Sequence, residues 1–489
     1  MESTVNRFIV FAPLLGAIFA FTGCSDGIDN NRLRVDVVED SPREISVGRM
    51  PLSPSSAYVR NATAQGLVAF DAEGKVVPAL AARWIVTDDD MGYIFRLQKT
   101  RWNNGREVRS DEVATALRSR INELRVGRFS DELAKISRVL PMTGKVVEIR
   151  LNAPIPNLLE LLAQPEFGLI HKANGTGPMA AERISGHLQL RNRLEESNGA
   201  IALDEKRVTL AANTPSRALA RFALGQTDLV LQGRFEHLPL LTATQGNASQ
   251  TRFDAVPGLF CLLAVADGPF LSNPSNRDAI AMAIDRPRML TSFGSTEWRE
   301  TLTLAPETLS NREKLPRPDW AGLNAQERKA RARSTISSWE SSSGPVRPLR
   351  IAMPRGTGSR ILFARLRSDL ASIGLDAERV TYAQPADLIL IDRVADISSP
   401  GWYLDQLSCR ATPVCSEKAD QLLDEARMAS SREERIRLWG EAERELIATR
   451  NFIPIANPVR WSLVRDGLLG FAQNPRGWHP LQYLGREPT

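Results

Sequence analysis

The feature that most constrains the fold of this chain is a strand, a helix and a second strand that follow one another in its second half. Residues 349–353 are apolar enough for a buried strand, and residues 360–373 have the spacing of an amphipathic helix that ends at Gly374. Residues 387–391 predict the next buried strand. Because a strand, a crossover helix and a strand form a parallel pair, this order predicts an α/β fold.

The rest of the chain has the same mixture of elements and no internal repeat. Residues 67–70 and 93–97 predict strands, and Ser110 is expected to cap a helix that starts at Asp111. A second amphipathic helix is expected after Ser431. A chain of 489 residues is too long for one hydrophobic core, so two lobes are expected.

The beginning of the chain has the pattern of an export signal. Residues 8–21 form an apolar run that follows Arg7 and stops just before Cys24. This pattern predicts a secretory signal peptide over residues 1–23. The run is shorter than the roughly 20 apolar residues that a bilayer-spanning helix needs. An uncleaved anchor and a chance cysteine are the alternatives.

The segment Phe21-Thr22-Gly23-Cys24 resembles the lipobox of bacterial lipoproteins, although Phe21 stands where that motif usually has Leu. The resemblance implies cleavage before Cys24 and attachment of lipid to this cysteine. The mature protein would then begin with a lipid-anchored tether over residues 24–45. Because no later apolar run is long enough to span a bilayer, the lipid would be its only hold on the membrane, and the protein would lie in the periplasm.

The other cysteines differ in their surroundings. Cys409 and Cys415 flank the loop-like residues 410–414, and in an oxidising compartment they can form a disulfide. Two free surface thiols are the alternative. Cys261 lies in the apolar residues 259–263, which indicate a buried strand, so an inert core thiol is expected there.

Composition and charge indicate a folded globular protein without a nucleic-acid partner or a cofactor. With 43% hydrophobic and 24% charged residues, the chain is expected to form a folded globular protein. Its net charge of +5 is spread out rather than gathered into a block of Lys and Arg, so no nucleic-acid partner is expected. The four histidines do not have metal-ligand spacing, so no metal or other cofactor is expected; they are His171, His187, His237 and His479.

Enzymatic activity is not expected either. Residues 23–27 match the Gly-X-Ser-X-Gly pattern of hydrolases, but cleavage before Cys24 would cut through this motif. No other credible nucleophile motif is present in the sequence.

Several sequence blocks resemble the signature of the extracytoplasmic solute-binding proteins of the peptide/nickel ABC-transporter family (family 5). The blocks are VPALAARW at 77–84, YIFRL at 93–97, WNNG at 102–105, SDEV at 110–113, GTGP at 175–178, RDAIAMAIDR at 277–286 and NPVRW at 457–461. Each block alone is weak, and their shared order carries the resemblance.

The resemblance implies a two-lobe periplasmic-binding-protein fold of type II, in the large peptide-binding class, with a cleft between the lobes. Lobe I would span residues 46–257, with an inserted subdomain at about 68–170. Lobe II would span residues 258–456, and residues 457–489 would return to lobe I. The implied function is that of a monomeric solute-binding lipoprotein of an ABC importer, which captures a peptide or peptide-like solute and delivers it to permease subunits. A binding lipoprotein without a transporter, acting as a sensor or chaperone, is the alternative.

The resemblance also implies where a peptide would bind. Peptide-binding members carry a Trp, then three residues later an Asp that pairs with the peptide's α-ammonium, then a second acid before a Pro. Here Asp396 keeps the amine-binding place, Arg393 replaces the Trp and Ser399 replaces the second acid. An ammonium removed from water needs a counter-charge, which suits Asp396, but Arg393 is close enough in sequence to pair with that carboxylate instead. Trp402 and Tyr403 could stack on a ligand in the cleft or belong to the core.

Overall fold

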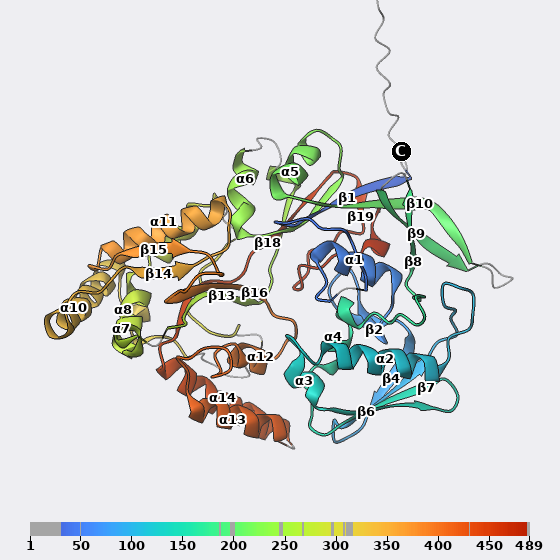
Figure 1. Cartoon of the computed structure of the whole chain (residues 1–489), viewed down its shortest axis with the longest axis horizontal. Coiled ribbons are helices and arrows are strands. Elements are labelled where there is room, and N and C mark those ends of the chain that lie inside the picture. Colours follow the sequence, from blue (N-terminus) through green and yellow to red (C-terminus); the bar gives the residue numbers. More distant parts are fainter. Residues whose placement is uncertain are drawn as a thin grey trace, which may run out of the picture.

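The computed structural model of the chain describes residues 31–48, 50–184, 187–195, 201–243, 248–266, 268–294, 298–306, 309, 316–429 and 431–486. The expected signal peptide and Cys24 lie outside the described residues. Three sheets organise the described chain (Figure 1). We call the part built on the seven-stranded sheet lobe I, the part built on the five-stranded sheet lobe II, and the part built on the four-stranded sheet the inserted subdomain.

Lobe I has a sheet in which one parallel strand from the start of the chain lies at the centre. The strand order is β12 (Thr251–Asp254), β18 (Arg460–Val464), β11 (Leu229–Gly233), β1 (Arg32–Val38), β10 (Ile201–Asn213), β9 (His187–Glu195) and β8 (Met179–Ile184). Strand β1 pairs in parallel with both β10 and β11, and the remaining pairs are antiparallel. The helices beside this sheet are α1 (Pro54–Thr63), α5 (Pro215–Ala223) and α6 (Leu238–Ala243).

Strand β1 corrects the expected tether. Residues 24–45 were expected to be a tether, yet residues 32–38 of this segment are a buried strand in the middle of a sheet. Val35 and Val37 are buried in the core, and the carboxylate of the buried Asp36 accepts a hydrogen bond from Arg221 at 2.8 Å. The pairing of Asp36 lets an acidic residue occupy a central strand, and this partner is far away in the sequence.

Lobe II contains the predicted parallel pair. Its sheet has the order β15 (Ala377–Val380), β14 (Leu349–Ala352), β16 (Leu388–Val394), β13 (Gly258–Ala264) and β17 (Phe452–Ala456). Strand β14 pairs in parallel with β16, as the strand–helix–strand order predicts, and α11 (Thr357–Ala371) crosses between them. The further helices of this lobe are α7 (Pro269–Ser272), α8 (Pro274–Ala283), α9 (Arg286–Thr291), α10 (Ala325–Ser343), α12 (Pro400–Asp405), α13 (Glu417–Met428) and α14 (Arg432–Ala448).

The inserted subdomain is an antiparallel sheet covered by helices. The sheet order is β4 (Ala81–Val86), β5 (Gly92–Leu97), β7 (Val146–Leu151) and β6 (Ile136–Met142), and the short strands β2 (Val68–Phe70) and β3 (Val76–Pro78) pair beside it. Its helices are α2 (Ser110–Leu124), α3 (Ser130–Ala134) and α4 (Leu158–Leu162). Ser110 is the first residue of α2, and the residue in the capping position is Arg109. Ser431 does cap α14, because its side chain accepts a hydrogen bond from the amide of Glu434.

Two short connections join lobe I to lobe II. Residues 255–257 lead from β12 to β13, and residues 457–459 lead from β17 back to β18. Where the first connection enters lobe II, Gly258 has a φ of +154°, and a Cβ atom there would lie 2.0 Å from the carbonyl oxygen of Arg393. Only glycine fits this close approach of two strands without displacing the backbone.

Apolar packing joins the three parts. One buried cluster runs from the four-stranded sheet of the inserted subdomain to α12, α13 and α14, and a second cluster crosses from the sheet of lobe I to the sheet of lobe II. In Figure 1 the helices α12 to α14 accordingly lie next to the inserted subdomain. No helix in the described ranges combines the length and the apolar character needed to cross a bilayer.

Candidate functional site

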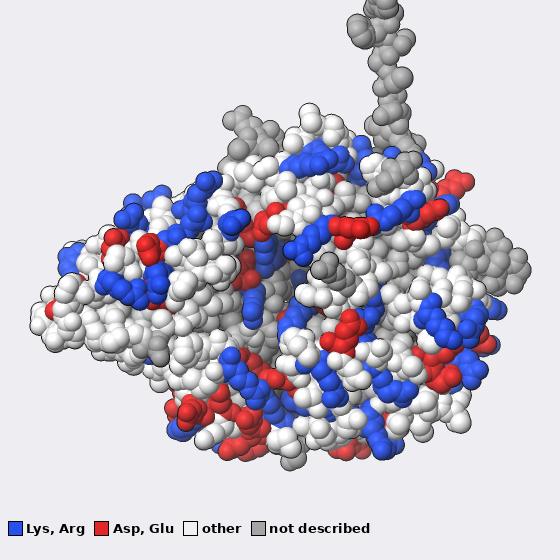
Figure 2. Space-filling model, viewed as in Figure 1, with Lys and Arg blue, Asp and Glu red and all other residues white. Residues whose placement is uncertain are grey.

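A cavity of about 770 Å³ lies where the three parts meet. Its volume is in the range of natural small-molecule sites. Figure 2 shows basic and acidic side chains close together around the hollow at the centre of the molecule. The wall residues from lobe I include Ala57, Gln232 and Trp478; those from the inserted subdomain include Arg128, Asp131, Glu132, Gln164 and Glu166; and those from lobe II include Asp392, Arg393, Asp396, Trp402, Asp405 and Arg410.

Asp396 is on the wall of this cavity and already has a cationic partner. Arg128 donates from Nη1 to the Oδ1 atom of Asp396 at 2.6 Å and from Nη2 to Glu166 at 2.6 Å. Arg128 and Glu166 both belong to the inserted subdomain, whereas Asp396 follows β16 of lobe II. The ion pair therefore joins two parts of the molecule across the cavity.

Arg393 does not pair with Asp396. Its Nη1 atom donates to the side-chain oxygen of Gln406 at 2.6 Å, and Arg393 is one of the residues that line the cavity. The ion-pair partner of Asp396 is therefore Arg128 and not Arg393, which the sequence suggested. No motif marks Arg128, and only the packing of the inserted subdomain against lobe II places it there.

The other three residues singled out from the sequence lie at different depths. Trp402 lines the cavity, whereas Ser399 lies in the capping position of α12 and lines a neighbouring cavity of about 730 Å³. Tyr403 is 0% exposed and packs edge-on against Trp402, with 4.9 Å between the ring centroids. Burial raises the pKa of the Tyr403 hydroxyl. The structure therefore brings Asp396 and Trp402 together at the main cavity and keeps Tyr403 in the core beneath them.

The chain around Asp396 is held by the inserted subdomain through backbone groups as well. The side chain of Gln164 donates to the carbonyl oxygen of Asp396 at 2.7 Å, and that of Asn157 donates to the carbonyl oxygen of Ser398 at 2.5 Å. The amide of Ser398 in turn donates to Glu160 at 2.7 Å. These contacts fix the backbone that presents Asp396, so its carboxylate has a defined place on the cavity wall.

Most other charges on the wall are also paired. Arg460 donates from Nη1 to Asp392 at 2.9 Å, and Arg410 donates to Asp131 at 2.8 Å. Glu132 has no ion-pair partner among the described residues, and burial raises the pKa of its carboxyl group.

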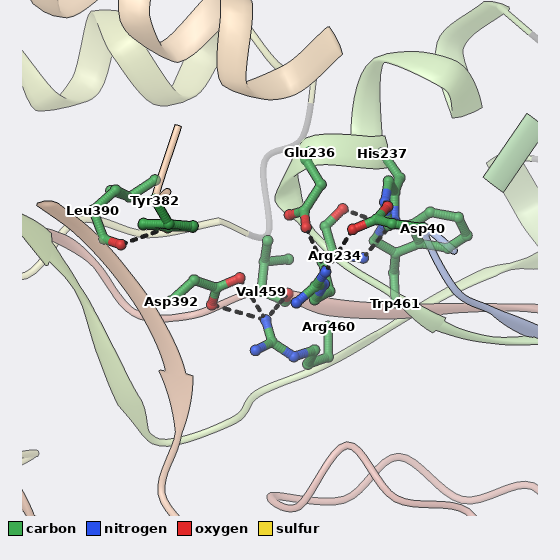
Figure 3. A network of polar contacts seen from close by, with 10 residues as sticks. All are labelled: Asp40, Arg234, Glu236, His237, Tyr382, Leu390, Asp392, Val459, Arg460 and Trp461. Carbon is green, nitrogen blue, oxygen red and sulfur yellow. Dashed lines mark hydrogen bonds and ion pairs between the residues drawn. The ribbon is translucent and has the colours of Figure 1, made fainter. Parts of the chain in front are cut away.

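A second polar network lies beside the two connections between the lobes (Figure 3). Arg234 contacts the carboxylates of Asp40 at 3.2 Å and Glu236 at 2.8 Å, and its carbonyl oxygen accepts a hydrogen bond from Trp461 at 3.0 Å. The hydrogen bond with His237, together with the charge of Arg234, lowers the pKa of Asp40. The possible ligand atoms of Asp40, Glu236 and His237 lie within 4.8 Å of one another, but the guanidinium of Arg234 already supplies a cation to both carboxylates.

Three cysteines of the described chain belong to lobe II. Cys409 and Cys415 are joined in a disulfide, and Cys261 is a buried free thiol in β13. Within the disulfide loop, Thr412 donates from its hydroxyl to the carbonyl oxygen of Ala264 at 2.7 Å, which ties the loop to the end of β13.

Comparison of the sequence with known proteins gives a consistent group of relatives. The chain is 24% identical over 476 residues to a "Probable di/tripeptide-binding protein 5" of Pseudomonas aeruginosa (strain UCBPP-PA14), which covers 84% of this chain and 87% of the relative. It is 22% identical over 494 residues to the "Peptide transport periplasmic protein SapA" of Salmonella typhimurium, with 84% of each chain covered.

Solved structures with the same fold include proteins described with different ligands. The murein tripeptide binding protein MppA of Escherichia coli has a TM-score of 0.74 and 17% identity, with 93% of this chain and 98% of that chain covered. NikA of Brucella suis, in complex with Fe(III)-EDTA, has a TM-score of 0.75 and 15% identity, with 93% of this chain and 100% of that chain covered. These similarities confirm the two-lobe periplasmic-binding-protein fold.

The family model described as "Bacterial extracellular solute-binding proteins, family 5 Middle" matches residues 75–411, which include the inserted subdomain and most of lobe II. The sequence resemblance is thereby confirmed, and the chain belongs to family 5 of the bacterial extracellular solute-binding proteins.

Proposed function

We propose that this protein captures a peptide or peptide-like solute in the cavity between its lobes and delivers it to the permease of an ABC importer. The observation that carries the proposal is the cavity of about 770 Å³, which is lined from both lobes and from the inserted subdomain and has Asp396 on its wall. The names of the relatives, which include di/tripeptide-binding and peptide-transport proteins, support a peptide as the solute.

Closure of the lobes would couple binding to delivery. Lobe I would comprise residues 46–257 and 457–489, with β1 added to it, and lobe II would comprise residues 258–456. A solute in the cavity touches all three parts only when the lobes are together, so binding shifts the population toward the closed form. The permease would recognise that form. Binding and release of a solute require no catalytic group, and we propose that the protein is not an enzyme.

Asp396 is the proposed anchor of the solute's ammonium group. The ammonium would replace Arg128 as the partner of the carboxylate, and Arg128 would keep its second partner, Glu166. An ammonium that leaves water needs such a counter-charge. We propose that Trp402, on the same wall, packs against the apolar part of the solute. Ser399 and Tyr403 would contact a ligand only after the wall rearranges.

We further propose that the protein acts as a monomer in the periplasm and is held at the membrane by lipid on Cys24. The chain would then work beside the permease rather than as a freely diffusing carrier.

Native mass spectrometry of protein purified from its own periplasm tests the proposed function. We expect a bound species whose mass, after release, is that of one or more short peptides. Asp396→Ala should reduce the occupied fraction, because an unpaired ammonium in the cavity is costly. Recovery of the wild-type protein with a compound that has no peptide bond, or failure of every short peptide to bind the emptied protein, would contradict the proposal.

A further inference from the structure

Within the described part of the chain, one arginine on the cavity wall has no carboxylate partner. The wall carries five arginines, namely Arg128, Arg393, Arg410, Arg460 and Arg476. Four of them form ion pairs at 2.6–2.9 Å. Arg128 pairs with Asp396 and Glu166, Arg410 with Asp131, Arg460 with Asp392, and Arg476 with Glu160. Arg393 has no ion pair among the described residues. Its side chain makes a single hydrogen bond among these residues, to the neutral amide of Gln406.

This contact leaves most of the guanidinium group available. A guanidinium has five N–H donors, and Gln406 accepts from only one nitrogen of Arg393. Gln406 is itself held, because its side-chain nitrogen donates to the carbonyl oxygen of Trp402 at 3.2 Å. Arg393 is thus oriented by a neutral neighbour, and it can present two parallel donors to a carboxylate.

The carboxylates near Arg393 do not fill this role. Asp392 precedes it in β16 and is bound to Arg460, and Asp396 is bound to Arg128. Asp405, at the end of α12, is bound to Arg427 at 2.6 Å. The positive charge of Arg393 is therefore not neutralised by a direct partner in the described part of the cavity.

Arg393 lies close to the proposed anchor of the solute's ammonium. It is three residues before Asp396, so their Cα atoms are at most about 11 Å apart. A peptide whose ammonium sits at Asp396 would bring its first two side chains near Arg393. We propose, on the basis of the proposed function, that Arg393 binds a carboxylate in the first or second residue of the solute, so that the protein prefers peptides with an acidic residue near the amino terminus.

Calorimetry with matched tripeptides tests this preference. The probes are Ala-Glu-Ala with Ala-Gln-Ala, and Glu-Ala-Ala with Gln-Ala-Ala, which differ in charge but hardly in shape. For at least one pair, the emptied wild-type protein should bind the Glu peptide about tenfold more tightly than the Gln peptide. This factor corresponds to the low end of the free energy of a hydrogen bond to a charged group, which is expected because Arg393 is exposed.

Variants of the arginine assign the preference to its side chain. Arg393→Gln should abolish the preference for Glu over Gln within each pair of peptides. Arg393→Lys should keep part of the preference, because an ammonium cannot make the bidentate contact. Arg109→Gln is a matched control, since Arg109 forms an exposed ion pair with Asp111 and does not line the cavity.

The outcomes separate this inference from the proposed function. Equal binding of Glu and Gln peptides by the wild-type protein would overturn the role of Arg393 and leave peptide capture standing. A preference that persists in Arg393→Gln would also overturn it, because another group would then bind the acid. If none of the four tripeptides binds and the native protein carries a compound without a peptide bond, the proposed function fails and this inference fails with it.

Discussion

At the scale of single residues, the pairing of Asp396 with Arg128 has a thermodynamic consequence. In the structure, the carboxylate of Asp396 is bound to the guanidinium of Arg128 from the inserted subdomain. We propose that the same carboxylate binds the solute's ammonium group. If the ammonium replaces that guanidinium, the ion pair exists only in the empty closed form. An interaction that is present only before binding opposes binding, so the wild-type affinity includes the loss of this ion pair.

Arg128→Gln should therefore bind free-amine peptides more tightly than the wild type. Partly exposed ion pairs contribute about 0.2–1 kcal/mol, which corresponds to an increase in affinity of up to about fivefold. Peptides with an acetylated amine should show no such increase, because they do not take over the carboxylate. Calorimetry with both forms of one tripeptide measures the effect, and Arg109→Gln again serves as the control. Weaker binding of the free-amine peptide by Arg128→Gln would show that Arg128 contacts the solute directly.

The site could be predicted from the sequence only in part. Asp396 and Trp402 lie within one short segment whose order resembles the family motif, and both reach the cavity. Arg128, Gln164 and Glu160, which hold that segment, come from a part of the chain more than 200 residues away. Such partners depend on how the inserted subdomain packs against lobe II, and local spacing carries no information about that packing.

At the scale of elements, the disulfide loop supports one wall of the cavity. The loop closed by Cys409 and Cys415 carries Arg410, which pairs with Asp131 of the inserted subdomain. Thr412 in the same loop is bound to the end of β13. The disulfide thus restrains a short segment that contacts both lobe II and the inserted subdomain.

Removal of the disulfide should destabilise the protein moderately. On the chain-entropy model, a loop as short as this one stabilises by roughly 2 kcal/mol. We expect Cys409→Ser/Cys415→Ser to lower the free energy of unfolding by about that amount in urea titrations. A reductant should lower the stability of the wild type and leave that of the double variant unchanged. Peptide mapping that finds Cys409 and Cys415 alkylated in the unreduced wild type would contradict the pairing.

Local signals predicted some elements better than others. The helix after Ser431 was predicted because a capping residue and an apolar stripe coincide there. The sequence of β1 alternates charged and apolar residues, a pattern typical of a half-buried strand. Its place in the middle of the sheet depends on the pairing of Asp36 with Arg221, which is 185 residues away in the sequence. Residues 337–348 are rich in Ser and Pro, which predicts a surface connection. Residues 337–343 of this stretch instead continue α10, a long helix that begins at the capping box of Asn324 and Glu327.

At the scale of the whole molecule, the proposed attachment to the membrane depends on Cys24, which lies outside the described residues. Cys24→Ala should yield protein without lipid, and once the leader is removed the variant should appear in the soluble periplasmic fraction. Cell fractionation and intact-mass measurement check both points, with Ser25→Ala as a control that should remain at the membrane. Full lipid labelling of Cys24→Ala would contradict the proposed anchor.

The two connections between the lobes determine how the cavity can open. Residues 255–257 leave β12 and residues 457–459 enter β18, and these two strands are neighbours in one sheet; β13 and β17, at the other ends of the connections, are neighbours in the next sheet. The connections therefore run side by side and form a two-stranded hinge between the lobes. Such a pair bends readily about one axis but resists twisting and sliding. Solutes of different thickness would then stop the lobes at different angles along a single path, and a permease could distinguish an empty from a loaded protein by that one angle.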